Sequence, residues 1–247
     1  MQLEWLAVGG IGAAIGFAGG VFGLGGGILA IPALVMIFGL DQQLAQGTTF
    51  LMVAPNAVLG IWHYYRHGSI DRRYAVMLAA CGLVGGYCGT LFALTLDAQH
   101  LRRFFSLFML ALIVYLACRE VLPSPARRPA ADWRWCSLVG LFCGSLTGFV
   151  TVGGAITSPP LLTRYFGLSQ QQAQGLALAI VAPSALISLV TYAVHREVDW
   201  NLGLPLCFGA MLTMRAGVGI AHRLPEQTLR RLFYVLLLAV ALMMFLR

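Results

Sequence analysis

The chain contains no lysine and very little charge of either sign. Only 10% of its 247 residues are charged and 59% are hydrophobic, whereas soluble domains carry about 25% charged residues. This composition excludes an ordinary soluble domain. Apolar runs long enough to cross the ~30 Å hydrocarbon core of a bilayer as helices predict an all-α polytopic membrane protein.

All sixteen basic residues are therefore arginine, and the net charge is +7. A basic balance can indicate nucleic-acid binding, but these arginines lie mainly at the ends of apolar runs, as in Arg72–Arg73 and Arg230–Arg231. This distribution is typical of the charge bias of membrane proteins. We expect the lipid bilayer as a partner and no nucleic acid.

The sequence also lacks the usual motifs of enzymes and metal proteins. Its six cysteines form no CxxC pair, so we interpret them as small packing residues. It has no P-loop, which argues against direct drive by ATP. No nucleophile–base pair or metal cluster falls at mid-depth of an apolar run. We therefore predict no catalytic residue, no metal and no cofactor, and a protein that is not an enzyme.

The first half of the chain aligns with the second at a constant offset of 128 residues. Glycines, prolines and one decapeptide recur at this offset: Gly12 with Gly140, Pro32 with Pro160, and FGLDQQLAQG (38–47) with FGLSQQQAQG (166–175). Internal duplication is common among secondary transporters. We predict two homologous four-helix membrane repeats, residues 1–119 and 135–247, joined by a polar linker at 120–134.

The first segment of each repeat is rich in glycine, which disfavours a continuous helix. Residues 5–39 are too long for one crossing at about 1.5 Å per residue, and the triple glycine at 25–27 favours a break there. A weaker counterpart lies at 151–155. We predict that the first helix of each half is broken at a Gly-rich turn.

A helix broken within lipid exposes amides that cost several kcal/mol unless they are satisfied. Amides at a half-helix N-terminus carry partial positive charge and bind anions. We therefore predict an anion cradle built from the glycines and threonine of the two breaks: Gly23, Gly25, Gly26, Gly27, Thr151, Gly153 and Gly154. Close helix packing is the alternative explanation of these glycines.

Polar side chains of the second and third segments add candidate ligands: Thr48, Thr49, Asn56, Gln174, Ser184 and Arg215. The first five lie on segments with a central proline, which bends a helix and frees a carbonyl. Gln46, on the second segment, is a further polar group of this kind. Interhelical hydrogen bonding explains all six equally well. Arg215 has no acidic residue in its segment, so it either attracts an anion or extends to the membrane interface.

Two His-x3-Asp pairs follow the second segments, His67/Asp71 and His195/Asp199. Metal binding is one interpretation of this spacing. We favour the other, in which each aspartate caps the next helix.

Three stretches resemble the sulfite exporter TauE/SafE family: GFAGGVFGLGGGILAIPAL (16–34), GSLTGFVTVGGAITSPPLL (144–162) and RLPEQTLRRLFYVLLL (223–238). The resemblance covers nearly the whole chain. It implies a multi-pass permease of the bacterial inner membrane, built from two similar halves of about four helices, with relatives that move sulfite and organosulfonate anions. The second half departs from the family's glycine motif, because Thr151 and Ala155 replace glycines.

We expect a secondary transporter for a small anionic solute, sulfite or an organosulfonate first, working by alternating access between the repeats. An anion-selective pore and the uptake of another anion are the alternatives. If each Gly-rich segment crosses once, the chain has eight spans. If each segment breaks and returns, the arginine bias is stronger and the repeats are inverted. A re-entrant segment is the third alternative, because residues 27–39 are short for a full crossing. The sequence leaves a homodimer open.

Overall fold

The computed structural model describes residues 2–22, 26–66, 72–121 and 135–221, together with positions 235 and 238. These residues form helices and no strand, which confirms the all-α expectation. The helices are α1 (Gln2–Phe22), α2 (Gly27–Ile37), α3 (Gln42–Arg66), α4 (Arg72–Thr95), α5 (Ala98–Val121), α6 (Cys136–Val150), α7 (Gly153–Phe166), α8 (Gln170–Val194) and α9 (Trp200–Ala221).

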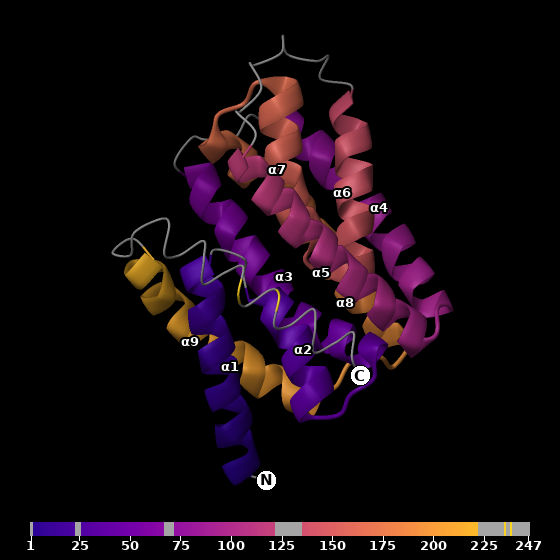
Figure 1. The fold of residues 1–247 in the computed structure, drawn as a ribbon, viewed down its shortest axis with the longest axis vertical. Coiled ribbons are helices and arrows are strands. Elements are labelled where there is room, and N and C mark those ends of the chain that lie inside the picture. Colours follow the sequence, from indigo (N-terminus) through magenta and orange to yellow (C-terminus); the bar gives the residue numbers. More distant parts are fainter. Residues whose placement is uncertain are drawn as a thin grey trace.

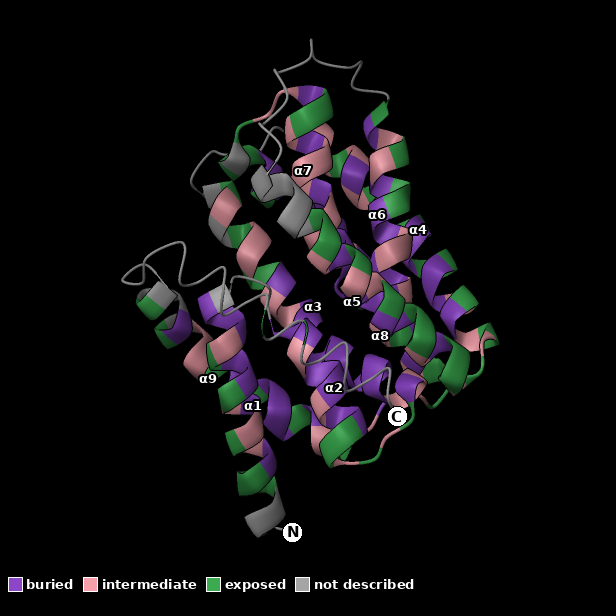
Figure 2. Ribbon diagram, viewed as in Figure 1, coloured by how far each residue is buried: buried purple, intermediate pink, exposed green. Residues whose placement is uncertain are grey.

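Helices α3 and α8 lie in the middle of the molecule, with the pair α1/α9 on one side and the pair α4/α6 on the other (Figure 1). Buried residues gather where these helices meet, and exposed residues lie on the outward sides (Figure 2). The two central helices run antiparallel. Gln46 near the start of α3 bonds to Tyr192 near the end of α8, and Tyr64 near the end of α3 bonds to Gln174 near the start of α8.

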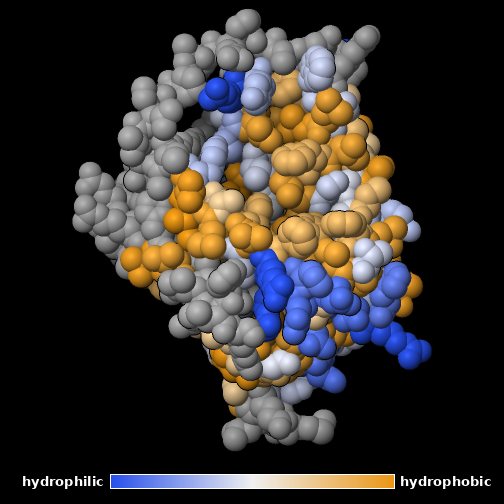
Figure 3. Space-filling view, turned by 45° about the vertical axis from the view of Figure 1, so that its right-hand side comes forward, coloured by the Kyte–Doolittle hydropathy of each residue, from blue (hydrophilic) through white to orange (hydrophobic). Residues whose placement is uncertain are grey.

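The outer surface is that of a membrane protein. Three described helices are long and apolar enough to cross a bilayer, over Gln42–Trp62, Arg72–Thr95 and Gln171–Val194. Large hydrophobic side chains such as Phe92 and Phe142 are exposed on outward faces, and hydrophobic residues form a broad band on the surface in Figure 3. Such a surface suits lipid and is unfavourable in water.

Glycines allow the flanking helices to pack backbone against backbone. A Cβ atom on Gly16 of α1 would overlap backbone atoms of Ala210 in α9, and one on Gly144 of α6 would overlap the backbone of Gly82 in α4. Small residues permit this close approach in lipid. The glycines of the third segment of the first repeat serve packing in the same way, since Gly89 abuts α6.

Both glycine-rich segments are broken, as the sequence predicts. In the second, the chain reverses between α6 and α7, so that Oγ1 of Thr157 lies 3.6 Å from Sγ of Cys143. In the first, α1 ends at Phe22 and α2 begins at Gly27, and Gly26 lies beside Ile15 of α1. Each segment is therefore a helical hairpin rather than one straight helix. The arms of the second hairpin have 15 and 14 residues, fewer than the about 20 that a crossing needs.

Two parts of the predicted organisation fall largely outside the described residues. Helix α5 extends to Val121 at the start of the predicted linker, and residues 122–134 are not described. The last apolar segment of the second repeat is described only at positions 235 and 238.

The prolines Pro55 and Pro183 lie inside α3 and α8, which continue through them.

Candidate functional site

The two helix breaks adjoin in the interior of the fold. A Cβ atom on Gly27, the first residue of α2, would lie 2.8 Å from Cγ2 of Val152 and 3.0 Å from Cγ2 of Val53. Val152 directly precedes α7. The starts of two half-helices that are far apart in the sequence therefore meet, and we term this meeting point the helix junction.

Neither half-helix at the junction is capped by a side chain. The N-cap residues are Gly26 and Val152, and within the described residues no side chain of theirs accepts a bond from the first helical turn. Gly26 has a φ of 77°, in the left-handed region that favours glycine. Because the first N–H groups of a helix have no intrahelical acceptor, the junction offers amide donors and the positive ends of two helix dipoles.

Thr151 directly precedes Val152, the N-cap residue of α7. Its φ is 69°, a strained value for a residue with a Cβ. The residue is fully buried, and its Oγ1 has no hydrogen-bond partner in the described part of the chain. An unsatisfied buried hydroxyl costs about 1–3 kcal/mol. Strain and an unpaired group at one position are typical of a site that binds a ligand.

Apolar side chains close the junction in this conformation. Cε of Met52 and Cγ2 of Ile15 lie 3.1 Å and 3.3 Å from the position of a Cβ on Gly26. The methyl group of Thr49 faces Gly27, while its hydroxyl donates to the carbonyl of Ala45 at 2.7 Å. The nearest contacts of these two glycines are thus uncharged. A solute must displace some of these side chains to reach the amides.

Helix α7 begins with Gly153 and Gly154 at the junction. The side-chain position of each glycine points toward α6. A Cβ on Gly153 would meet Leu146, and one on Gly154 would overlap the hydroxyl of Thr147. These two glycines therefore allow the hairpin to close. Their side-chain position is taken up by packing, so only their backbone amides are left to act as ligands.

Three other predicted ligands lie away from the junction or in helix contacts. Thr48 Oγ1 accepts a bond from the N–H of Asp199 at 2.9 Å, and Ser184 Oγ lies 2.7 Å from the carbonyl oxygen of Gly82. Gln174 is exposed and accepts a bond from the hydroxyl of Tyr64 at 3.0 Å. Interhelical hydrogen bonding, the alternative that the sequence left open, thus describes the contacts of Ser184 and Gln174, whereas Thr48 bonds to the turn between α8 and α9.

The remaining predicted residues are less fully described. Asn56 is half-buried on α3. Gly23 and Gly25 lie outside the described residues, as does the side chain of Arg215, whose backbone is part of α9. No group of three or more His, Cys, Asp or Glu residues in the described ranges could hold a metal ion.

Asp199 caps the following helix, as predicted. Its Oδ1 accepts bonds from the N–H groups of Asn201 and Leu202 at 2.9 Å and 3.1 Å. The other predicted cap, Asp71, lies outside the described residues.

Gln46 is one of the polar groups selected from the sequence, whereas Gln42, at the start of α3, is not. Gln42 and Gln46 are both buried. The carboxamide atoms of Gln42 and Nε2 of Gln46 have no hydrogen-bond partner among the residues described. The signal was present, since both residues belong to the decapeptide 38–47 that recurs in the second repeat.

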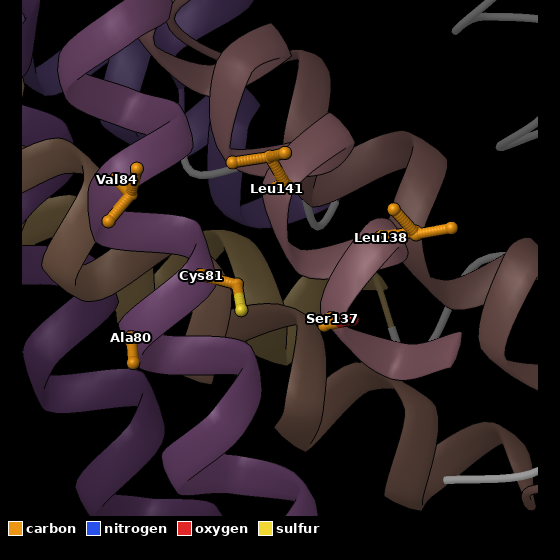
Figure 4. Close-up of a pocket in the computed structure, with 6 residues that line it drawn as sticks. All are labelled: Ala80, Cys81, Val84, Ser137, Leu138 and Leu141. Carbon is orange, nitrogen blue, oxygen red and sulfur yellow. The ribbon is translucent and has the colours of Figure 1, made fainter. Parts of the chain in front are cut away.

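A groove of about 290 Å³ lies between α4 and α6, away from the junction (Figure 4). Its lining is Ala80, Cys81, Val84, Ser137, Leu138 and Leu141. Val84, Leu138 and Leu141 are exposed on the outer surface. The groove has no charged group to bind an anion, and its apolar lining suits membrane hydrocarbon.

Glu197, in the turn between α8 and α9, gives a pH-dependent prediction. Burial, and then the charge of Asp41, raise the pKa of this carboxyl, while His195 lowers it. Because the pKa is higher in the folded state, the protein loses stability as pH rises from the ordinary carboxyl pKa through the raised one. We expect Glu197→Gln to raise the melting temperature at neutral pH, and this gain to vanish at acidic pH, where Glu197 is protonated.

Thermal unfolding of the purified protein in detergent, measured across pH, checks this expectation. Asp97→Asn, at a highly exposed carboxyl, is the matched control and should change little. A gain for Glu197→Gln that is the same at every pH would contradict the assigned cause.

Comparison with known proteins relates this chain to one family and to proteins that are named as transporters. The family model described as "Sulfite exporter TauE/SafE" matches residues 8–244. A "Probable membrane transporter protein" of Xylella fastidiosa (strain 9a5c) is 30% identical over 240 residues, which are 94% of this chain and 92% of the relative. "Probable membrane transporter protein YdhB" of Bacillus subtilis is 22% identical over 83% of this chain and 85% of its own length. No solved structure matches the chain significantly.

Proposed function

Because the chain belongs to the sulfite exporter TauE/SafE family, whose relatives here are named as membrane transporters, we propose that it carries small anions across the bacterial inner membrane. Sulfite and organosulfonates are the first candidates. The observation that carries the proposal is the helix junction, where two uncapped half-helix starts adjoin and where Thr151, the residue before the N-cap Val152, has an unpaired buried hydroxyl. Amide donors and helix dipoles are suited to a small anion.

The directions of the helices support transport by alternating access. Helices α3 and α8 correspond at the offset of 128 residues, yet they run antiparallel. The contact of Gly12 with Leu206 recurs as the contact of Gly140 with Leu78, and both pairs of positions differ by 128 (140 − 12 and 206 − 78). Two halves inverted in this way can exchange conformations, which opens the site to each side of the membrane in turn.

The hairpins fit the same scheme. The first hairpin ends at Ile37, just before α3, and the second ends at Phe166, just before α8. Since α3 and α8 are antiparallel, the hairpins start from opposite ends of the molecule and meet at the junction. A site between two half-helices at mid-depth is the arrangement used by many secondary transporters.

The proposal is tested by replacing Thr151 with valine. This change removes the unpaired hydroxyl and keeps the branched shape of the side chain. We expect the affinity of the purified protein for sulfite to fall about 10- to 100-fold, because a hydrogen bond to a charged group contributes about 1.5–3 kcal/mol. Without an anion, the melting temperature should stay the same or rise, since an unsatisfied buried group is removed.

Binding is measured by isothermal titration calorimetry and by thermal shift, with sulfite, sulfate, thiosulfate and methanesulfonate as probes. Thr163→Val is the matched control, because Thr163 lies farther along α7 and donates to the carbonyl of Pro160. Equal sulfite affinity for wild type and Thr151→Val would contradict the proposed site. Anion flux into proteoliposomes that does not saturate would identify a pore instead of a carrier.

A further inference from the structure

A line of side chains on one face of α3 leads from the start of this helix to the junction. Gln42, Gln46, Thr49 and Val53 are spaced by four, three and four residues, so they lie above one another on the helix. Thr49 and Val53 contact Gly27 at the junction. We term Gln42 and Gln46 the glutamine pair; it lies one to two turns closer to the start of α3.

The glutamine pair is buried with unsatisfied amide groups. Gln42 is 2% exposed, and neither its Nε2 nor its Oε1 has a partner within the described ranges. Gln46 is fully buried; its Oε1 accepts a bond from the hydroxyl of Tyr192 at 2.9 Å, and its Nε2 has no partner among those residues. Buried polar groups are nearly always paired, so unpaired ones indicate a missing water or ligand.

The corresponding position in the second repeat provides an internal comparison. Gln174 corresponds to Gln46, and its bond with Tyr64 repeats the bond between Gln46 and Tyr192 at the opposite end of the α3/α8 pair. Gln174 is exposed, however, so water can reach its amide. We term the end of the α3/α8 pair that contains Gln46 the Gln46 end. At this end the unpaired amides are enclosed by protein.

Two further features distinguish the Gln46 end. Thr48 bonds to the N–H of Asp199 and holds the α8–α9 turn against α3, whereas the corresponding Leu176 has no hydroxyl. The carboxylates of Asp41 and Glu197 also lie at this end, close enough for Asp41 to act on Glu197. Their negative charges disfavour a dianion more than a monoanion.

We propose that the glutamine pair is a second binding station for the transported anion, and that it takes a small oxyanion carrying an O–H group. In either orientation of its carboxamide, Gln42 offers both an NH₂ group as donor and a carbonyl oxygen as acceptor. The donors of Gln42 and Gln46 bind anion oxygens, and the acceptor of Gln42 binds the O–H. A sulfonate has no such proton to donate. This proposal rests on the proposed function, because the glutamine pair would pass the same anion to the junction.

The test compares hydrogen sulfite with methanesulfonate at one mildly acidic pH, where most sulfite carries a proton. Calorimetry on the purified full chain should show tighter binding of hydrogen sulfite by the wild type. We expect Gln42→Leu to weaken hydrogen sulfite binding about tenfold and to leave methanesulfonate binding nearly unchanged. Gln171→Leu, at an exposed glutamine near the start of α8, is the control and should alter neither affinity.

Stability without an anion separates a ligand station from a structural role. Because Gln42→Leu replaces an unpaired amide with an apolar group, the variant should melt at the same or a higher temperature. Gln42→Met, with an unbranched chain closer in shape to glutamine, serves if the leucine variant does not fold. A lower melting temperature with unchanged hydrogen sulfite binding would assign the pair to a structural water and overturn the proposal.

The remaining outcomes distinguish this station from the junction. If Gln42→Leu binds hydrogen sulfite as tightly as the wild type while Thr151→Val binds it more weakly, the station is wrong and the proposed function stands. If the wild type binds neither anion, the proposed function fails and the station fails with it.

Discussion

Gly16→Ala is expected to destabilise the protein by about 3 kcal/mol or more, at the upper end of the cost of overpacking. The added methyl group would overlap backbone atoms of Ala210, which no change of rotamer can move. Helices α1 and α9 would have to separate along their contact, and the close packing that holds helices together in lipid would be lost. Thermal unfolding and the monodisperse yield on size-exclusion chromatography in detergent measure the effect.

Gly10 supplies the control for this prediction in the same helix. A Cβ on Gly10 would meet nothing within 4 Å, so Gly10→Ala should be neutral or stabilise by about 0.5–1 kcal/mol through helix propensity. Gly144→Ala should be as harmful as Gly16→Ala, because it overlaps the backbone of Gly82. Normal stability of Gly16→Ala would show that α1 and α9 do not pack this closely.

Gly27→Ala is expected to lower anion flux in proteoliposomes about 10- to 100-fold while the protein stays folded. One extra carbon atom in a tight site changes discrimination by about this factor. The added methyl would lie 2.8 Å from Val152 and 3.0 Å from Val53. Those contacts are with side-chain ends that can shift, so the fold survives, but the methyl group occupies the space next to the amides of the junction.

A second substitution makes this prediction specific to the junction. In the double variant Gly27→Ala/Val152→Ala, the valine methyl group nearest to the added carbon is removed, and we expect flux to recover. Contacting residues are the ones that show such non-additivity. Gly10→Ala, on an exposed face of α1, should transport like the wild type. Flux unaffected by Gly27→Ala would contradict a role of the junction in transport, and failure of Val152→Ala to restore flux would show that the two breaks do not share one space.

The sequence by itself determined the features that depend on local composition. Long apolar runs with few charges require helices in lipid, because only a helix satisfies its own backbone there. The glycines at 25–27 indicated where the first helix of the first half breaks, since glycine opposes a continuous helix. In the second half the interruption falls at Thr151 and Val152, directly before the glycines at 153–154. The aspartate cap of α9 was likewise readable, because Asp199 acts on amides only two and three residues away.

Only the tertiary structure decided which polar groups form hydrogen bonds within the protein and which remain unpaired. Thr48 and Ser184 looked like ligands in the sequence, but each meets a partner more than 100 positions away, in Asp199 and Gly82. The contact between Gly27 and Val152 likewise joins residues more than 100 positions apart in the sequence. No local pattern encodes such contacts, because they arise from how hairpins and helices pack. For the same reason the burial of Gln42, the basis of the second station, emerged only from the fold.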